Sequence, residues 1–140
     1  MNLNFIKNKK ILITGGTGSI GSSLVFRLIK SQCKVLRVMS NDENGLYELS
    51  KEVIKKNIIN YDLFFDQMGK NRIRFFLGDV RDKTRCAEVT KDVDIVIHAA
   101  AIKHVNISEY NNLEAIKTNY WGTKNMLKAI GQAYETASSK

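Results

Sequence analysis

This sequence of 140 residues lacks proline, cysteine clusters and long apolar runs. The absence of proline excludes no fold class. No apolar run approaches the roughly 20 residues that a membrane-spanning helix needs. The first residues, from Met1 to Lys7, also lack the apolar stretch and small-residue cleavage site of an export signal. We therefore expect a cytoplasmic protein with no membrane partner.

The two cysteines, Cys33 and Cys86, lie far apart in the sequence. Neither belongs to a Cys-x-x-Cys pair or to a cluster with histidine, so the usual signals of a metal site and of a disulfide framework are missing. We expect two reduced thiols that serve as packing residues, and no metal site.

Positive charge is in excess but spread along the chain. Lys and Arg number 22 against 14 Asp and Glu, a net charge of +8. Residues 1–70 hold 11 basic and 6 acidic groups, and residues 71–140 hold 11 and 8, so no basic tail or arm exists. Diffuse basicity is not the footprint of a nucleic-acid surface, and we expect no nucleic-acid partner.

Strand and helix signals alternate along the chain. Short apolar runs predict strands at 11–14, 34–39, 73–77 and 94–99. Helical periodicity predicts helices at 20–29, 46–54, 83–91 and 111–130, with a further helical segment within 57–71. Such alternation predicts an α/β fold, a doubly wound parallel sheet of about four strands with helices on both faces. Residues from about 131 to 140 are expected to form a frayed or atypical tail.

The strongest chemical signal is the run T-G-G-T-G-S-I-G at 14–21, which leaves a predicted strand and opens a predicted helix. Its glycines fit G-x-G-x-x-G from Gly16 and G-x-x-G-x-x-G from Gly15. Such loops aim the amides of a helix N-terminus at a pyrophosphate, which indicates a Rossmann-type dinucleotide site. A ligand-free glycine turn is the plainer interpretation. A nucleoside-triphosphate loop is disfavoured because Ser22 stands where that loop needs lysine.

The choice between NAD and NADP is normally read about 20 residues past the glycines, at the end of the second strand. An acidic residue there favours NAD and a basic one favours NADP. This sequence offers Ser40 and Asn41, with Asp42 slightly late and Arg37 inside the strand, so the signal is ambiguous. Asp42 serves equally well as the N-cap of the next helix.

Several motifs in a fixed order carry a family resemblance. They are I-L-I-T-G-G-T-G-S-I-G at 11–21, F-L-G-D-V-R-D at 76–82, H-A-A-A-I-K-H-V at 98–105, E-Y-N at 109–111 and E-A-I-K-T-N-Y-W-G-T at 114–123. With them the chain resembles the N-terminal part of the extended short-chain dehydrogenase/reductase superfamily. Within it, the chain resembles the polysaccharide-biosynthesis branch of UDP-N-acetylglucosamine 4,6-dehydratases and nucleotide-sugar epimerases.

The resemblance implies a site for NAD or NADP. It assigns the pyrophosphate to the glycine loop, the adenine to the third strand's end and the nicotinamide ribose to the three alanines after the fourth strand. The implied cofactor-binding residues are Gly15, Thr17, Gly18, Ser19, Ile20, Gly21, Ser40, Asn41, Asp79, Val80, Ala99, Ala100 and Ala101.

The resemblance identifies no confident catalytic residue in this chain. It implies a supporting role for Asn119 and a place near the sugar for Lys103 and His104, which are equally well explained as surface residues. His98, inside an apolar strand, is expected to be a core residue, as is Trp121 beside Met126 and Leu127.

The resemblance also implies a catalytic Tyr-x-x-x-Lys segment after a fifth strand, which residues 1–140 do not show. Two matches to that pattern, Tyr47 with Lys51 and Tyr120 with Lys124, fall in the wrong parts of the sequence, and we interpret both as chance matches. The catalytic and substrate-binding part is therefore expected to be absent, and 1–140 to be an N-terminal NAD(P)-binding segment.

Three interpretations follow from these observations. The first is the cofactor-binding part of a nucleotide-sugar 4,6-dehydratase or epimerase that acts on a UDP-N-acetylhexosamine in surface polysaccharide or glycan biosynthesis. In such an enzyme, the resemblance implies hydride transfer from the sugar's C4 to the cofactor and back. The second is a non-catalytic NAD(P)-binding sensor or partner module. The third is a remnant with uncovered apolar surface, which would associate, so a homo-oligomer is possible.

Overall fold

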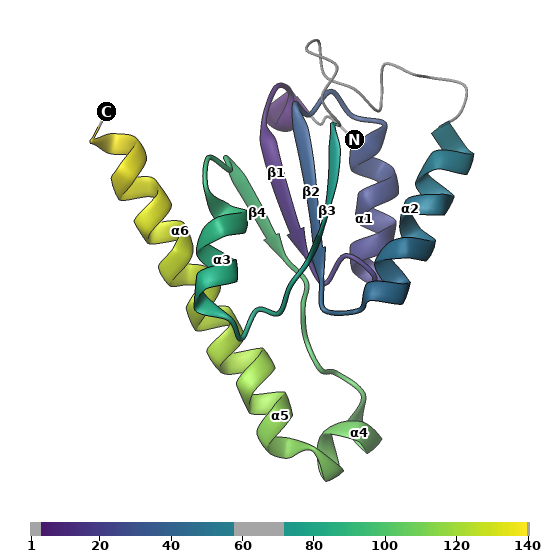
Figure 1. The fold of residues 1–140 in the computed structure, drawn as a ribbon, viewed down its shortest axis with the longest axis vertical. Helices are drawn as coiled ribbons and strands as arrows, with labels where there is room; N and C mark the ends of the chain where they lie inside the picture. Colours follow the sequence, from purple (N-terminus) through teal and green to yellow (C-terminus); the bar gives the residue numbers. More distant parts are fainter. Residues whose placement is uncertain (1–3, 58–71, 140) are drawn as a thin grey trace.

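The computed structural model describes residues 4–57 and 72–139, in which strands and helices alternate (Figure 1). The helical segment expected within 57–71 lies outside the described residues. The elements in chain order are η1 (Asn4–Ile6), β1 (Lys10–Thr14), α1 (Ser19–Ile29), β2 (Val35–Ser40), α2 (Glu43–Asn57), β3 (Ile73–Leu77), α3 (Lys83–Thr90), β4 (Ile95–His98), α4 (Val105–Tyr110), α5 (Asn112–Ile116), the π-helical segment η3 (Lys117–Gly122) and α6 (Thr123–Ser138).

The strands form one parallel sheet in the order β3-β2-β1-β4. β1 is paired on both sides, so that Ile11 lies opposite Leu36 of β2 and Ile95 of β4. Ile11, Leu12 and Ile13 are fully buried. A strand covered on both faces has no polar side to present, which is why β1 is an unbroken apolar run instead of an alternating one.

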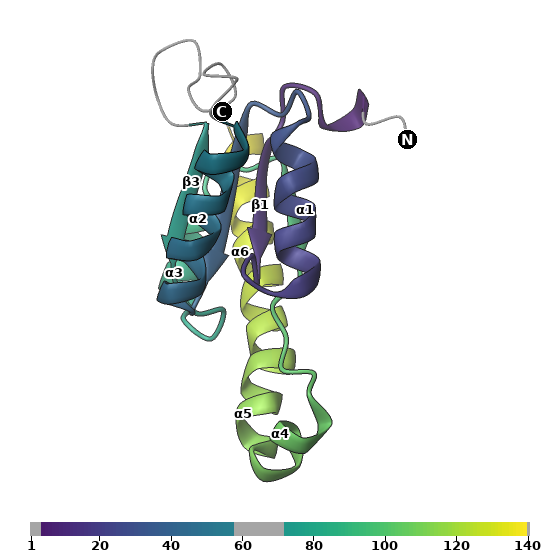
Figure 2. The ribbon, with the colours of Figure 1, turned by 90° about the vertical axis from the view of Figure 1, so that its right-hand side faces the viewer.

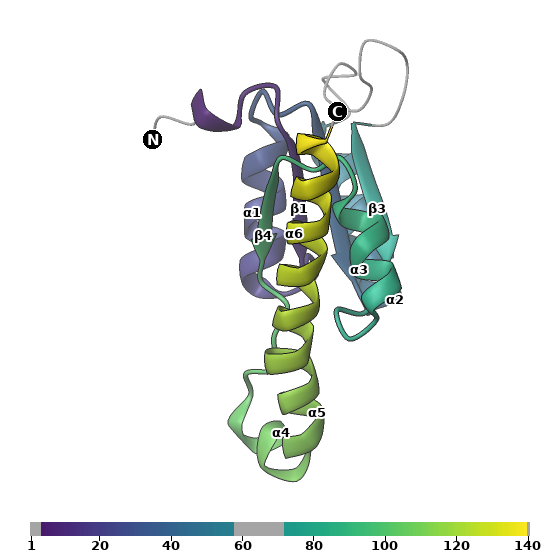
Figure 3. The same cartoon turned by 90° about the vertical axis from the view of Figure 1, so that its left-hand side faces the viewer.

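Helices cover both faces of the sheet. Ile13 packs with Val25 of α1 and Val53 of α2 on one face, whereas Leu12 packs with Met126 of α6 on the other. Figure 2 shows α1 and α2 in front of the sheet, and Figure 3 shows α3 and α6 in front of its opposite face. The predicted doubly wound parallel α/β fold of Rossmann type is therefore confirmed.

The chain after β4 differs from the sequence prediction. The helix α4 was not predicted, and the helix expected at 111–130 is divided by the π-helical segment η3. The tail from about residue 131, which was expected to be frayed or atypical, is helical as far as Ser138, where α6 ends. Hydroxyl groups of its last turns bond carbonyl oxygens four residues earlier, as from Thr136 to Gln132 at 2.8 Å, and so remain compatible with the helix.

The packing prediction for the two cysteines is confirmed, whereas that for Trp121 is wrong. Cys33 and Cys86 are buried and unpaired, as expected, and burial raises the pKa of the Cys86 thiol to about 11. The core assignment is wrong for Trp121, which is 47% exposed. On the same helical segment Met126 is buried, whereas Leu127 is 65% exposed. Only the face of α6 turned to the sheet is covered.

Within residues 4–57 and 72–139, every helix is too short or too polar to span a membrane.

The contrast between Leu12 and Leu127 yields a stability test. Leu12→Ala is expected to lower the free energy of unfolding by about 2–5 kcal/mol, because it opens a cavity in a fully buried site. Urea unfolding followed by circular dichroism measures the change. Leu127→Ala, at an exposed site on α6, is the matched control and should change stability by less than about 0.5 kcal/mol. Equal losses for the two variants would contradict the described core.

Candidate functional site at the carboxyl edge of the sheet

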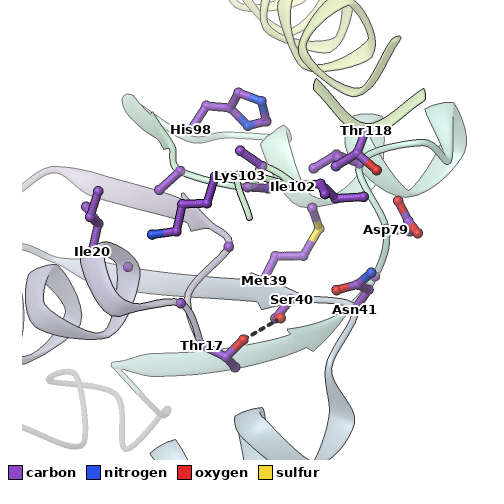
Figure 4. Close-up of a pocket in the computed structure, with 18 of the residues that line it drawn as sticks. Thr17, Ile20, Met39, Ser40, Asn41, Asp79, His98, Ile102, Lys103 and Thr118 are labelled. Atoms are coloured by element: carbon purple, nitrogen blue, oxygen red, sulfur yellow. Dashed lines mark hydrogen bonds between the residues drawn. The ribbon is translucent and has the colours of Figure 1, made fainter. Parts of the chain in front are cut away.

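A cavity of about 660 Å³ lies where the four strands end. Its walls come from the glycine loop after β1, the ends of β2 and β3, and the segment after β4, with Glu114 and Thr118 from the α5 and η3 region (Figure 4). The carboxyl edge of a parallel sheet, at the point where its strand order reverses, is where doubly wound folds bind their ligands.

The glycine loop lies in backbone contact with its neighbours. Gly15 has φ +67°, and a Cβ there would come within 2.6 Å of the Ala100 nitrogen. A Cβ on Gly21 would overlap the Gly15 carbonyl oxygen, so only glycine lets α1 begin this close to β1. The loop is anchored by hydrogen bonds from the Gly16 amide to the Met39 carbonyl at 3.0 Å and from the Gly18 amide to the Gly15 carbonyl at 3.1 Å.

The N-terminus of α1 faces the cavity without a side-chain cap. Gly18 is its N-cap residue, and the first turn contains no acidic side chain. Gly18, Ser19, Ile20 and Gly21 all line the cavity. The first amides of a helix have no partner within it and carry a partial positive charge, so this end of the cavity suits a phosphate or pyrophosphate.

Polar groups at the end of β2 continue the wall. The Thr17 and Ser40 hydroxyl oxygens lie 2.8 Å apart (Figure 4), and the Asp42 amide donates to the Ser40 Oγ at 3.2 Å. The Asp42 Oδ1 accepts from the Gly45 amide at 2.9 Å. Of the two interpretations of Asp42, the structure shows the N-cap of α2.

An ionic network forms the far end of the cavity. Arg81 donates to Asp79 from its main-chain N at 2.9 Å and from its Nε at 2.8 Å, and it also forms an ion pair with Glu114. Burial opposes ionisation of Asp79, but the hydrogen bonds from Arg81 and its positive charge, with a smaller contribution from the Asn41 amide, lower the pKa of the carboxyl. Glu114 also accepts from Lys117 at 2.8 Å, the main cause of its own lowered pKa. Asp79 is thus a fixed, ionised acceptor.

Asn119 lies in η3, outside the residues that line the cavity, and holds one of its walls. Its side chain accepts from the Ile102 amide and donates to the Ile102 carbonyl, both at 2.8 Å. Ile102 itself lines the cavity. A π-helical turn inside an α-helix commonly marks a functional position. The predicted supporting role of Asn119 therefore has a geometric basis in the segment after β4.

His98 connects β1, β4 and α6. Its Nδ1 lies 2.7 Å from the Thr14 Oγ1, and its Nε2 lies 3.1 Å from the Thr123 Oγ1. The Thr123 hydroxyl donates to the Asn119 carbonyl at 2.7 Å, so it accepts from His98 Nε2–H, and Nδ1 accepts from Thr14. Half-burial lowers the pKa of the imidazole. His98 is a satisfied histidine, as the sequence predicted, but it is half-buried instead of lying in the core, and it borders the cavity.

The predicted site residues lie almost entirely together. All the residues expected to hold the cofactor line this one cavity, and so does Lys103. His104 does not line it and instead occupies the N-cap position of α4. Neither tyrosine of the Tyr-x-x-x-Lys pairs is among the lining residues, and Lys51 lies 4.7 Å from the ring of Tyr47 on the exposed face of α2.

Three residues contribute to the site although the sequence did not predict it. Arg81 and Glu114 stood inside quoted motifs, but their pairing across the cavity carried no sequence signal. Asn125 is 5% exposed on α6 and donates to the carbonyl oxygens of Val80 and Arg81, each at 3.0 Å. The sequence signal that could have identified Asn125 is its position as a polar residue on the buried face of a predicted helix. Through its two hydrogen bonds, Asn125 fixes the loop that contains Asp79.

Residues 11–136 match the family described as polysaccharide biosynthesis protein. The chain belongs to the polysaccharide biosynthesis protein family. The family match spans every element from β1 into α6, including the complete cavity wall.

Two curated proteins show how similar this chain is to other sequences. The uncharacterized membrane protein MJ1061 of Methanocaldococcus jannaschii is 45% identical over 125 residues, which are 89% of this chain and 33% of that protein. A UDP-N-acetylglucosamine 4,6-dehydratase (inverting) of Campylobacter jejuni is 43% identical over 122 residues, 86% of this chain and 32% of that enzyme. The chain thus spans about a third of the length of each of these two relatives.

Solved structures share the same arrangement. Pen from Bacillus thuringiensis superposes with a TM-score of 0.78 at 36% identity, covering 92% of this chain and 35% of that one. DesIV, a dTDP-glucose 4,6-dehydratase from Streptomyces venezuelae solved with NAD and TYD bound, gives a TM-score of 0.66 at 26% identity, covering 89% and 36%.

The lowered pKa of His98 predicts a pH dependence of stability. Between its folded pKa and its ordinary value of 6.5, the unfolded chain binds more protons than the folded chain. The free energy of unfolding should therefore fall as the pH drops below about 6.5, as urea titrations at about pH 7.5 and about pH 5.5 would measure. His98→Gln should remove much of that loss. His104→Gln, at the exposed histidine, should retain it, and the reverse pattern would contradict the assignment.

Proposed function

We propose that this chain is the NAD(P)-binding, N-terminal part of a nucleotide-sugar 4,6-dehydratase or epimerase that acts on a UDP-N-acetylhexosamine in surface polysaccharide or glycan biosynthesis. The observation that carries the proposal is the uncapped N-terminus of α1, aimed across a glycine loop into a cavity whose far end is the Asp79 carboxylate. A dinucleotide needs both an anion site and an adenine acceptor, at opposite ends of one cavity.

The residues present fit the cofactor along its length. The first-turn amides of α1 would bind the pyrophosphate, and Asp79 would accept from the adenine amino group beside Val80. Ala99, Ala100 and Ala101 present small side chains where the nicotinamide ribose needs close backbone approach. When bound, the nicotinamide supplies a hydride acceptor and donor. The chain's own residues bind and orient it.

The substrate part of the proposal rests on relatives. The Campylobacter jejuni relative is named a UDP-N-acetylglucosamine 4,6-dehydratase, and further relatives from Rickettsia are named UDP-glucose 4-epimerase. Lys103, at the cavity wall after β4, and the segment held by Asn119 would face the sugar.

A non-catalytic NAD(P)-binding sensor or partner module is the second candidate. The observation that favours it is that, among the described residues, neither Tyr-x-x-x-Lys pair lines the cavity, so no tyrosine and lysine are placed for proton transfer there. The two candidates share the cofactor site and differ in sugar chemistry.

Self-association and a cytoplasmic location complete the proposal. Large apolar side chains are exposed on the segment from α4 to α6, among them Val105, Leu113 and Trp121, which supports a homo-oligomer. Both cysteines of the described chain are unpaired, which suits a reducing compartment.

The cofactor site is tested by titration calorimetry with NAD⁺ on variants of Ile20. This residue lies in the first turn of α1 and is 61% exposed. Ile20→Glu should weaken binding by about tenfold, because its carboxylate would lie beside the pyrophosphate. The same carboxylate favours the helix N-terminus, so folding should be unharmed. Ile20→Gln, of similar size without charge, should bind close to wild type.

Two results would contradict this placement. One is the absence of binding to folded wild-type chain by either NAD⁺ or NADP⁺ at millimolar concentration. The other is equal binding by the Ile20→Glu and Ile20→Gln variants.

The sugar chemistry is tested on the natural protein that contains this sequence, purified as the cell produces it. Incubation with cofactor and UDP-N-acetylglucosamine should yield either a product lacking one water, by mass spectrometry, or a C4 epimer of unchanged mass, by NMR. Cofactor binding with no change in the sugar would overturn the enzyme proposal and favour the module.

A further inference from the structure

The wall between the pyrophosphate and adenine ends of the cavity decides which adenosine ribose fits, and this inference rests on the proposed function. Ser40 and Asn41 lie in that wall, between Thr17 of the glycine loop and Asp79 (Figure 4). NADP differs from NAD by one phosphate on the ribose 2′ oxygen, which needs a cation or free amides to receive it.

The cations of the cavity are committed elsewhere. Among the described residues that line it, the cationic side chains are Arg81 and Lys103. Arg81 is bound to Asp79 and Glu114 through its Nε, Nη1 and Nη2 atoms. Lys103 follows β4 and extends towards Ile20, away from Asn41 (Figure 4).

A carboxylate also caps the helix N-terminus nearest to Asn41. α2 begins at Glu43, directly after this wall, and its N-terminus would be the nearest anion site. The Asp42 carboxylate already accepts from the Gly45 amide at 2.9 Å and caps that end. A Cβ on Gly45 would meet both Asp42 and the Thr17 methyl group, so this carboxylate lies beside the glycine loop.

Asn41 itself faces an acid. The Asn41 amide lies beside Asp79 (Figure 4) and contributes, after Arg81, to the lowered pKa of that carboxyl. The amide of Asn41 has a carbonyl oxygen as well as its NH₂ group, so it suits a ribose hydroxyl, which both donates and accepts. A 2′-phosphate would instead meet the Asp42 and Asp79 carboxylates, because Arg81 is paired with Asp79 and Lys103 extends away from Asn41 (Figure 4).

We propose that this chain binds NAD in preference to NADP, and that Asn41, which lies beside the Asp42 and Asp79 carboxylates, sets the preference. The neutral ribose hydroxyl is accommodated by the Ser40 and Asn41 wall. The additional phosphate of NADP is rejected by the carboxylates on either side of it.

Calorimetric titration of the full chain with NAD⁺ and with NADP⁺ tests the preference. The overall charge of +8 attracts any extra phosphate, so salt of about 0.15 M is used to limit that attraction to about 8 Å. NAD⁺ should bind on the order of tenfold more tightly than NADP⁺. Adenosine 2′,5′-bisphosphate and AMP repeat the comparison on the adenosine half alone, and AMP should bind more tightly.

Two variants at the exposed Asn41 locate the cause. Asn41→Arg should raise the affinity for NADP⁺ relative to NAD⁺ by about tenfold or more, because an arginine fork binds phosphate. Asn41→Gln is the matched control and should keep the wild-type ratio. An unchanged ratio in the arginine variant would show that Asn41 does not set the preference.

The outcomes separate this inference from the proposed function. Wild-type chain that binds NADP⁺ as tightly as NAD⁺, or more tightly, overturns the inference and leaves the NAD(P)-binding proposal standing. Folded wild-type chain that binds neither overturns both.

Discussion

Close backbone packing at the end of β1 is the constraint on which the cavity depends. Gly15 lies so near Ala100 that a side chain on Gly15 would overlap the segment after β4, and Gly21 lies as near to Gly15 itself. These contacts bring the first turn of α1 and the exits of β1 and β4 to one edge. Because the buried parallel sheet fixes where each strand ends, the helix amides and the alanine segment face the same space.

One long helical segment then fixes the loops around that space. From η3 and α6, Asn119 bonds Ile102, Thr123 bonds His98, and Asn125 bonds the Val80 and Arg81 carbonyls. Each polar side chain satisfies main-chain groups or a side chain that burial would otherwise leave unpaired. The segment therefore sets the positions of both walls, although most of its own residues do not line the cavity.

The two ends of the cavity differ in charge. The uncapped start of α1 supplies partial positive charge, whereas Asp79 and Glu114 gather at the opposite end around Arg81. Exposed ion pairs of this kind contribute little stability individually. Their effect is to hold Asp79 ionised and in place, and to occupy the guanidinium that would otherwise be available to a phosphate.

The strands, the helices up to α3 and the glycine loop were predictable from the sequence, because periodicity and glycine spacing are local properties. The helix α4, the π-helical turn and the full length of α6 were not, since tertiary contacts determine them. The Arg81–Glu114 and Asn125–Val80 contacts join residues 33 and 45 positions apart, which no local pattern encodes. Thus the sequence by itself determined the α/β alternation and the identity of the loop that faces the cavity. Only the tertiary structure decided that Asn41 lies beside Asp79 (Figure 4) and that Trp121 is exposed, because both depend on how distant segments of the chain pack together.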